Sequence, residues 1–564
     1  MDTEQTIAIF KDNAGRKSLR VMFIEMIVEF IDPMQIELLS ALARERANCT
    51  TYFSVEQEHD VRADLKRIQP HVVALSAKTG GYPITLKYAR WAKQNNPNTI
   101  VVVGGPHCTF DQSLIEYDDV DVVVAGEADD AWVELLESIM AGKSCDTIKN
   151  IFTKSNWKSK FKNATQVERW QHMADRLVNL DKLPYLDREI VYTRVPHIAK
   201  FPMRSFMTSR GCPYQCTYCF EPKYNEMYRG KGHPYQRYSP ERVVEELRYT
   251  MERYPTQFIK FYDDIFWIHK HLDQEPWLKE FAKLYGKHIK LPFFLLTRCN
   301  ILTEDHLKLL KPAGLHSMTM SIEAGNDYVR NEVIKRHMSR EDIIRAFHLC
   351  DKYGVKTFAN TILGIPVRPE ILKEQKKSAI EMDIESVLIN VEAKVTFGEF
   401  TIIYPYAGCH FSDYVEENKW FNTKDFEKLH HSYQSWSPLN CFSQKEKIQQ
   451  LNLSSLGTVC LAVPWITPWV IKYFMKVRWV WVQKYVYHSL YFIAKGYLMM
   501  FKIYPMNLGI SNFWHLALRA WKNEVSKRSP GENLYDDSKN TRNGSNGKIS
   551  KETASPALEA VVPH

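Results

Sequence analysis

The chain has 564 residues, 45% of them apolar and 25% charged, which is the composition of an ordinary globular protein and excludes a mostly disordered chain or a small disulfide-stapled module. At roughly 100 to 200 residues per domain, this length predicts two to four domains, each large enough to bury its own core. The net charge of +8 is interleaved along the chain instead of gathered in basic runs, so charge alone indicates no nucleic-acid partner.

The amino-terminal segment MDTEQTIAIFKDNAG lacks the basic region and apolar stretch of a secretory signal. The chain contains 11 cysteines, an odd number that fits a reducing compartment better than complete disulfide pairing. We therefore expect a cytoplasmic protein with free thiols.

Residues 18–143 alternate strand-like and helix-like patterns. Buried strands are predicted at SLRVMFIEMI, HVVALSA, TIVVVGG and VDVVVAG, and helices between them at PMQIELLSALARE, VRADLKRI and LKYARWAKQN. This order predicts a doubly wound α/β domain whose ligand lies beyond the carboxyl ends of parallel strands. Residues 144–200 follow with polar and turn-rich segments, and we interpret them as a linker.

A second βα series covers residues 201–400. Its predicted strands are RSFMTSRG, FIKFYDDIF, PFFLLTR, HSMTMSIEAG, KTFANTILGIP and ESVLINVEA, with helical patterns such as PERVVEELRYTMERY and REDIIRAFHLCDKYG between them. Such a series predicts a partial (β/α)6 parallel barrel with its functional loops at the carboxyl ends of the strands.

The βα rhythm stops near residue 400, and residues 401–521 are predicted to form a helical carboxyl-terminal region rich in aromatic residues and lysine. The apolar run from Leu456 to Met475 carries Pro464 and Pro468, which makes it a poor spanning helix. We expect a helical cap over the barrel mouth, with peripheral membrane contact and a transmembrane helix as alternatives. Residues 522–564, dominated by Ser, Asn, Lys and Gly, are predicted to be a disordered tail.

Three cysteines, Cys212, Cys216 and Cys219, follow the first predicted barrel strand within one short loop. Iron-sulfur clusters usually take four cysteine ligands, so three thiolates on a four-iron cube would leave one iron open to an external ligand. A zinc site or three buried free cysteines are the alternatives. Zinc usually takes four ligands at finger-like spacing, and His233 nearby has no paired partner.

The CxxxCxxC loop, its position after a barrel strand and the aromatic Phe220 behind it resemble the radical S-adenosylmethionine superfamily. The resemblance implies a 4Fe-4S cluster bound by Cys212, Cys216 and Cys219, with S-adenosyl-L-methionine on the fourth iron. One electron, from a reductant such as flavodoxin or ferredoxin, would cleave that molecule to methionine and a 5'-deoxyadenosyl radical.

The likeness extends to polar residues that end the later barrel strands, where family members place groups near the cosubstrate. Asp263 and Asp264 end the second strand, Arg298 the third and Glu323 the fourth. We expect Phe220, Asp263, Arg298 and Glu323 to contact the cofactor, whereas barrel-closing ion pairs or helix caps are the alternative.

In the first domain, Ser76 ends one strand and Gly104 and Gly105 end the next, a spacing that resembles cobalamin-binding Rossmann-like domains. The resemblance implies that Ser76, Gly104 and Gly105 bind cobalamin, because a glycine pair lets the nucleotide tail approach the backbone. The positions of the family's Asp, His and Gly hold Glu29, Ile31 and Met34, so no protein imidazole is expected on cobalt. A degenerate domain that only scaffolds the barrel is the alternative.

Together the two resemblances imply a cobalamin-dependent radical enzyme, similar to class B radical methyltransferases and the anaerobic Mg-protoporphyrin cyclase. The first hypothesis is methylation of an unactivated carbon or phosphorus of a small molecule through the 5'-deoxyadenosyl radical and methylcobalamin. The second is oxidative cyclisation or rearrangement with the same cofactors, and the third is a non-catalytic corrinoid-binding scaffold. The aromatic carboxyl-terminal helices would suit an apolar substrate.

Overall fold

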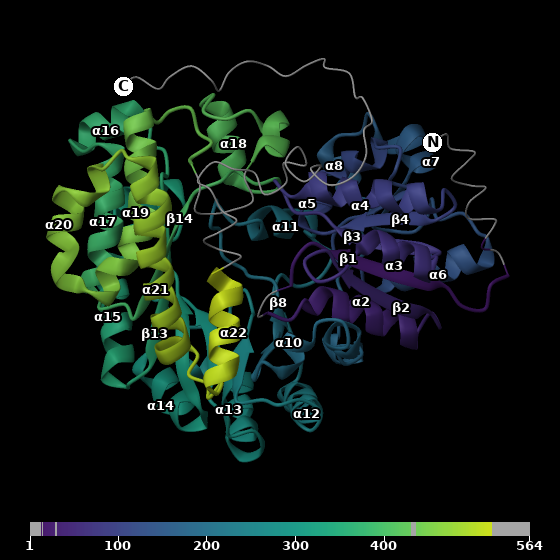
Figure 1. Cartoon of the computed structure of the whole chain (residues 1–564), viewed down its shortest axis with the longest axis horizontal. Helices are drawn as coiled ribbons and strands as arrows, with labels where there is room; N and C mark the ends of the chain where they lie inside the picture. The colour runs from purple at the N-terminus through teal and green to yellow at the C-terminus, as the bar shows by residue number, and fades with distance from the viewer. Residues whose placement is uncertain (1–12, 14, 29–30, 430–435, 522–564) are drawn as a thin grey trace.

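The computed structural model describes residues 13–521 except residues 14, 29–30 and 430–435. The predicted tail at 522–564 and the position of Glu29 therefore lie outside the described residues. Two sheets lie side by side (Figure 1). Of the carboxyl-terminal helices, α19 (Gln444–Ala462), α20 (Thr467–Lys472) and α21 (His488–Leu498) lie on the flank of the second sheet away from the first, whereas α22 (Ile510–Trp521) lies toward the first domain, where Arg519 pairs with Glu58.

The first sheet has the strand order β2-β1-β3-β4-β5-β6. Its strands are β1 (Arg20–Glu25), β2 (Thr50–Val55), β3 (Val72–Ser76), β4 (Ile100–Gly104), β5 (Val122–Val124) and β6 (Ile151–Thr153). All pairs are parallel except β5 with β6, which is antiparallel. One face packs on α2 (Met34–Glu45) and α6 (Asp129–Ala141), the other on α3 (Val61–Ile68) and α4 (Tyr82–Asn95). The predicted α/β fold is confirmed; β2 and β6 were not predicted.

The second sheet is parallel throughout, with the order β14-β13-β12-β11-β10-β7. Its strands are β7 (Met203–Phe206), β10 (Phe258–Phe261), β11 (Phe293–Thr297), β12 (Leu315–Met320), β13 (Lys356–Leu363) and β14 (Phe397–Ile402). Its outer helices are α12 (Pro240–Met251), α13 (Pro276–His288), α14 (Glu304–Ala313), α15 (Arg340–Lys352) and α17 (Ala379–Glu392). Because neighbouring strands follow one another along the chain with helices on one face, the sheet curls into the predicted partial barrel.

One predicted strand is wrong: ESVLINVEA lies in α17. Ser378 starts this helix with a capping box, in which its side chain accepts from the Glu381 N–H while Glu381 accepts from the Ser378 N–H. The β-branched residues of the segment resembled a strand, but that cap favours a helix over them. The sixth barrel strand is β14, a short way further along the chain.

Residues 499–504 close the barrel at the amino ends of its strands, so the cap over the mouth predicted from the run after Leu456 is wrong. Helix α18 (His410–Glu417) does reach the carboxyl ends, where the Phe411 N–H donates to the Thr217 carbonyl of the cysteine loop (2.8 Å). Helix α19 (Gln444–Ala462) packs beside β14, where the Thr458 hydroxyl donates to the Gly398 carbonyl (2.7 Å). Beyond α21 (His488–Leu498) and the π-helix η10 (Met499–Ile503), Tyr504 contacts Phe258, the first residue of β10. Over the described stretches, no helix combines the length and apolar composition that a bilayer crossing needs.

Lys260 of β10 is buried at this closed end, with its Nζ 4.3 Å from the Tyr262 ring centroid and 4.9 Å from that of Tyr504. Burial lowers the pKa of Lys260 to about 7, and the nearby Glu399 carboxylate opposes this shift only in part. Because the unfolded chain then binds more protons than the folded one between pH 7 and 10.5, stability should rise with pH across that range.

We therefore expect Lys260→Met to be more stable than the wild type at pH 7 and this advantage to shrink by on the order of 2 kcal/mol at pH 9. Melting temperatures of both proteins at the two pH values measure the difference. A difference in melting temperature between the two proteins that does not change with pH would contradict the expectation.

A buried network joins the two sheets through the segment between them. Arg188, which immediately precedes α9 (Glu189–Tyr192), lies 3.1 Å from the Asp32 carboxylate and donates to the Ser205 carbonyl of β7 (2.6 Å). Asp32 accepts in turn from the Ser205 N–H (2.8 Å) and the Tyr192 hydroxyl (2.6 Å). Since all four groups are buried, each charge depends on partners from another part of the fold.

Candidate active site

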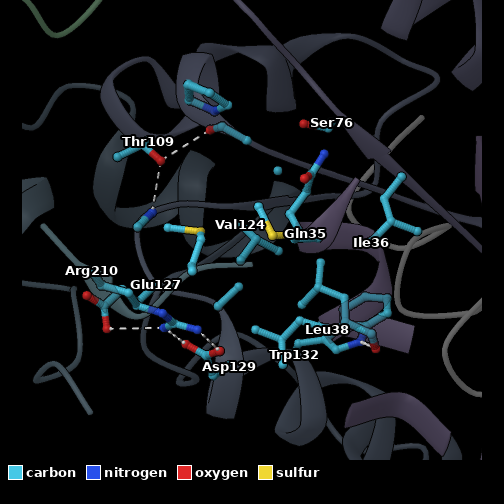
Figure 2. Close-up of a pocket in the computed structure, with 18 of the residues that line it drawn as sticks. Gln35, Ile36, Leu38, Ser76, Thr109, Val124, Glu127, Asp129, Trp132 and Arg210 are labelled. Carbon is cyan, nitrogen blue, oxygen red and sulfur yellow. Dashed lines mark hydrogen bonds and ion pairs between the residues drawn. The ribbon is translucent and has the colours of Figure 1, made fainter. Parts of the chain in front are cut away.

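One cavity of about 500 Å³ lies between the carboxyl ends of the two sheets. The first domain contributes residues from β1, α2, β3 and β4, among them Glu25, Met34, Ser76, Gly104 and Gly105. The barrel contributes residues from the end of β7, the cysteine loop and the end of β10, among them Met207, Arg210, Phe220, Glu221 and Asp264. Figure 2 shows residues of the wall, most of them from the first domain. Groups bound by either domain would therefore face the same space.

The two glycines after β4 have different roles in this wall. Gly105 has φ +97°, and a Cβ there would lie 2.6 Å from the Ser76 Oγ, so its backbone requires glycine. A Cβ at Gly104 would only touch the Val124 carbonyl at an ordinary 3.6 Å. Gly104 pairs with Ser76 in the sheet register, so the structure brings the three predicted cobalamin residues together at the cavity edge.

Polar groups in the same wall were not predicted. Burial raises the pKa of Glu25 to about 7, although Lys78 opposes the shift. Glu25 Oε1 and Glu127 Oε2 are buried and have no hydrogen-bond partner within the part of the chain that the structure describes. Cobalamin carries peripheral amide groups that could donate to such oxygens, so the wall fits this cofactor. No sequence pattern marks these residues, because each is a single acid at the end of an apolar strand.

The expectation that no histidine binds cobalt stays a prediction, and two residues bear on it, Ile31 and His107. Among the described residues lining the cavity there is no histidine, and Ile31, at the position of the family's histidine, is 41% exposed. His107 is buried instead against Tyr82, with ring centroids 4.8 Å apart, and its Nδ1 lies 3.2 Å from the Thr79 hydroxyl.

An ionic contact joins the first domain to the strand before the cysteine loop. Arg210 forms a bidentate ion pair with the Asp129 carboxylate (2.7 and 2.9 Å) and lies 3.9 Å from the Glu127 carboxylate, as Figure 2 shows. Arg176 approaches Glu127 from the connecting segment (3.7 Å). These ion pairs fix the position of the cysteine loop relative to the first domain, which carries Gly104 and Gly105.

Cys212, Cys216 and Cys219 lie between β8 (Ser209–Arg210) and α11 (Glu221–Met227), and all three thiols are free. Asn225 donates to the Cys212 carbonyl (2.8 Å), which fixes the start of the loop. Within the described ranges, no three His, Cys, Asp or Glu side chains could hold a single metal ion, so the zinc alternative finds no site there. Each cysteine of a four-iron cube binds a different iron, so its ligands stand farther apart than those of one ion.

Two buried arginines surround Cys216. The Nη1 atoms of Arg298 and Arg336 lie 3.4 and 3.5 Å from its sulfur. Burial alone would raise the pKa of the Cys216 thiol, but Arg336 and Arg298 together hold that pKa below its ordinary value. This favours the thiolate, the form that binds iron. Arg298 was predicted from its strand end; Arg336 was not, because it lies in an irregular loop with no motif around it.

We expect Arg298→Met to shift the midpoint potential of the bound cluster to more negative values. Reduction adds negative charge to the cluster, and loss of a nearby buried cation makes that charge less favourable. Spectroelectrochemical titration measures the shift, and Arg298→Lys, which keeps the charge, should move the potential less. Equal potentials in the wild type and the Met variant would contradict the expectation.

The remaining predicted site residues have distinct environments. Glu323 is buried with φ +67°, a constrained conformation for a residue with a side chain, and accepts from the Tyr218 hydroxyl (2.8 Å). Asp263 is fully buried and accepts from the Thr208 N–H (2.8 Å) and the Ser209 hydroxyl (2.6 Å), so it holds the turn before the cysteine loop. Its neighbour Asp264 lines the cavity, as does Phe220, which is 37% exposed.

Two family models match the chain: one described as B12 binding domain over residues 25–136, and one described as Radical SAM superfamily over residues 206–374. The chain therefore combines a B12-binding domain with a radical S-adenosylmethionine domain. The cofactors of this class are a 4Fe-4S cluster, S-adenosylmethionine and cobalamin.

Curated relatives with this combination differ in their named reactions. The chain is 25% identical over 404 residues to an uncharacterized methyltransferase of Pyrococcus horikoshii, covering 70% of this chain and 81% of that protein. It is 25% identical over 337 residues to the anaerobic magnesium-protoporphyrin IX monomethyl ester cyclase of Rubrivivax gelatinosus, covering 57% and 56%. It is 24% identical over 302 residues to the hopanoid C-3 methylase of Methylococcus capsulatus, covering 52% and 54%.

Solved structures share the fold. The radical S-adenosylmethionine methyltransferase TsrM of Kitasatospora setae, with cobalamin and a [4Fe-4S] cluster bound, matches with a TM-score of 0.55 at 16% identity, over 71% of this chain and 78% of that one. The cobalamin-dependent radical enzyme OxsB matches with a TM-score of 0.55 at 15% identity, over 91% and 77%.

Proposed function

We propose that this protein is a cobalamin-dependent radical methyltransferase that methylates an unactivated carbon or phosphorus of a small molecule. The observation that carries the proposal is a cavity whose wall runs from the edge at Gly104 and Gly105 to the cysteine loop. Methyl transfer between two cofactors needs one shared space. Two of the similar curated proteins, from Pyrococcus horikoshii and Methylococcus capsulatus, are named as methylating enzymes.

Each side of the cavity has its own task in this proposal. The bound cofactors supply a carbon-centred radical and a methyl group. Cys212, Cys216 and Cys219 hold the cluster, and the arginines beside Cys216 keep it ionised. Ser76, Gly104 and Gly105 border the corrinoid. Apolar wall residues, among them Phe220, exclude water that would react with a radical.

Oxidative cyclisation or rearrangement is the second candidate function, because the cyclase of Rubrivivax gelatinosus matches at the same identity as the uncharacterized methyltransferase. It would use the same cavity and cofactors. A corrinoid-binding scaffold without catalysis is the third. The arginine pair at Cys216 supports a bound cluster, since Arg336 and Arg298 favour the thiolate that binds iron.

The test is anaerobic reconstitution with iron, sulfide and hydroxocobalamin, followed by reduction and assay against a panel of small molecules. Equal amounts of S-adenosylhomocysteine and 5'-deoxyadenosine, with a methylated product, would support methyl transfer. 5'-Deoxyadenosine with a cyclised or rearranged product and no S-adenosylhomocysteine would support the second function. No cleavage of S-adenosylmethionine by a fully loaded protein would support the scaffold.

A further inference from the structure

The carboxyl-terminal helices carry a surface that the proposed chemistry does not use. We define the aromatic-basic face as the outward side chains of η7 (Pro464–Ile466), α20 (Thr467–Lys472), η8 (Phe474–Lys476), η9 (Val482–Tyr487), α21, η10 and the turns between them. We propose that this face docks the protein onto a membrane surface that carries anionic lipids. Helix α20 lies on the flank remote from the first sheet, so docking there would leave the cobalamin domain away from the bilayer (Figure 1).

The first observation is the exposure of large aromatic side chains. Trp465 is 75% exposed, Trp479 65%, Trp481 57% and Trp469 56%. Aliphatic and aromatic residues of the neighbouring turns extend the patch, namely Tyr473, Phe474, Val480, Tyr485, Ile493, Tyr497 and Phe501. So many exposed large apolar side chains on one set of successive helices indicate an interaction surface, because water strongly disfavours them.

The second observation is the charge of the same segment. From Lys447 to Trp521 the sequence contains no Asp or Glu, although the whole chain carries 66 of them. The basic residues in the segment are Lys447, Lys472, Lys476, Arg478, Lys484, Lys495, Lys502 and Arg519. Lys495 pairs with Glu399 and Arg519 with Glu58, but Lys472, Lys476 and Arg478 are exposed among the tryptophans.

These features together fit a lipid interface better than a protein partner. Trp and Tyr favour the headgroup level of a bilayer, where the ring is apolar and its N–H or O–H stays hydrated. Lysine and arginine beside them attract anionic lipids, while a lack of carboxylates removes repulsion from the same lipids. The short helices of this face, interrupted at Pro464 and Pro468, suit a position along the interface.

The experiment uses the full chain reconstituted with its cofactors and needs no catalytic activity, so its result is independent of the proposed reaction. The protein is sedimented with vesicles of phosphatidylcholine alone or mixed with phosphatidylglycerol. We expect binding to the mixed vesicles, weaker binding to neutral ones, loss of binding at high salt and a blue shift of tryptophan emission. Binding that is equal for both vesicles, or absent, would overturn the proposal.

Two sets of variants separate the apolar and charged contributions. Trp465→Gln with Trp469→Gln, Trp479→Gln and Trp481→Gln should abolish the blue shift and most of the binding. Lys472→Glu with Lys476→Glu and Arg478→Glu should reduce binding to mixed vesicles by on the order of a hundredfold. The matched control combines Tyr117→Gln, Tyr249→Gln and Lys158→Glu, exposed positions outside the face, and should bind like the wild type.

Melting temperature and cofactor content show that each variant is folded. Size-exclusion chromatography with light scattering tests the alternative that a second copy of the chain, and not a membrane, covers the aromatic-basic face. If the tryptophan variants dissociate a dimer and the wild type does not bind vesicles, the face is an interface between copies and the membrane proposal is wrong.

Discussion

Replacement of Cys212, Cys216 or Cys219 by Ala, one at a time, is expected to abolish both the visible absorbance of the reconstituted cluster and the reductive cleavage of S-adenosylmethionine. Three thiolates are the minimum that hold a cube with one open iron, so none is dispensable. The loss at Cys216 should be as complete as at the other two, even though Arg298 and Arg336 remain beside it. Iron content, absorbance and 5'-deoxyadenosine formation are the measurements.

Cys299→Ala is the matched control. Cys299 directly follows Arg298, but it is fully buried in the barrel core. Its removal should cost stability of on the order of 1 kcal/mol and leave the iron content unchanged. A variant of the Cys212 loop that retains full cleavage activity would show that this loop does not hold the cluster.

Gly104→Val is expected to reduce retention of cobalamin sharply, whereas Gly104→Ala should retain much more of it. A single Cβ fits at this position at ordinary contact distance from its neighbours. The two further methyl groups of valine would extend along the cavity wall where the corrinoid is proposed to bind. Gly105→Val should also lose cobalamin, but it is a weaker test, because its left-handed backbone and the close Ser76 side chain make misfolding a competing cause.

The same samples test the coordination of cobalt. His107→Ala should leave the electron paramagnetic resonance spectrum of the cob(II)alamin state unchanged, because His107 is buried against Tyr82 and does not line the cavity. A nitrogen ligand splits the cobalt lines into triplets. Triplets in the wild type that disappear in His107→Ala would mean that a histidine binds cobalt and that the proposed position of the cofactor is wrong.

The parts of the fold that could be predicted from sequence are those with local signals. Apolar strands ending in Ser76 and Gly104, and a cysteine loop directly after β8, place their functional groups through short-range geometry. The segment in α17 was predicted wrongly because a run of β-branched residues is ambiguous between strand and buried helix, and the deciding cap at Ser378 lies before it.

Several site residues could not be predicted, because their roles arise from distant parts of the chain. Arg336 reaches Cys216 across 120 positions, and Glu127 meets Arg210 only because the two domains dock. The closure of the barrel at the amino ends of its strands could not be predicted for the same reason. Tyr504 covers Phe258 from nearly 250 positions further along, and no periodicity in either segment indicates the contact.

The buried network of Asp32, Arg188, Tyr192 and Ser205 limits how this protein can be divided or recombined. A shortened chain that ends after the first domain would leave Asp32 without the Ser205 N–H and Arg188, and an isolated barrel would leave Arg188 open to water without the Asp32 carboxylate. A chimaera buries these groups again, so a mismatched parent would leave one charge buried without the other. A buried charge without its partner typically costs about 3 to 5 kcal/mol, roughly the margin by which a domain is folded. Chimaeras that exchange cobalamin modules between relatives should therefore carry the strand β7, the segment with Arg188 and the loop with Asp32 from the same parent.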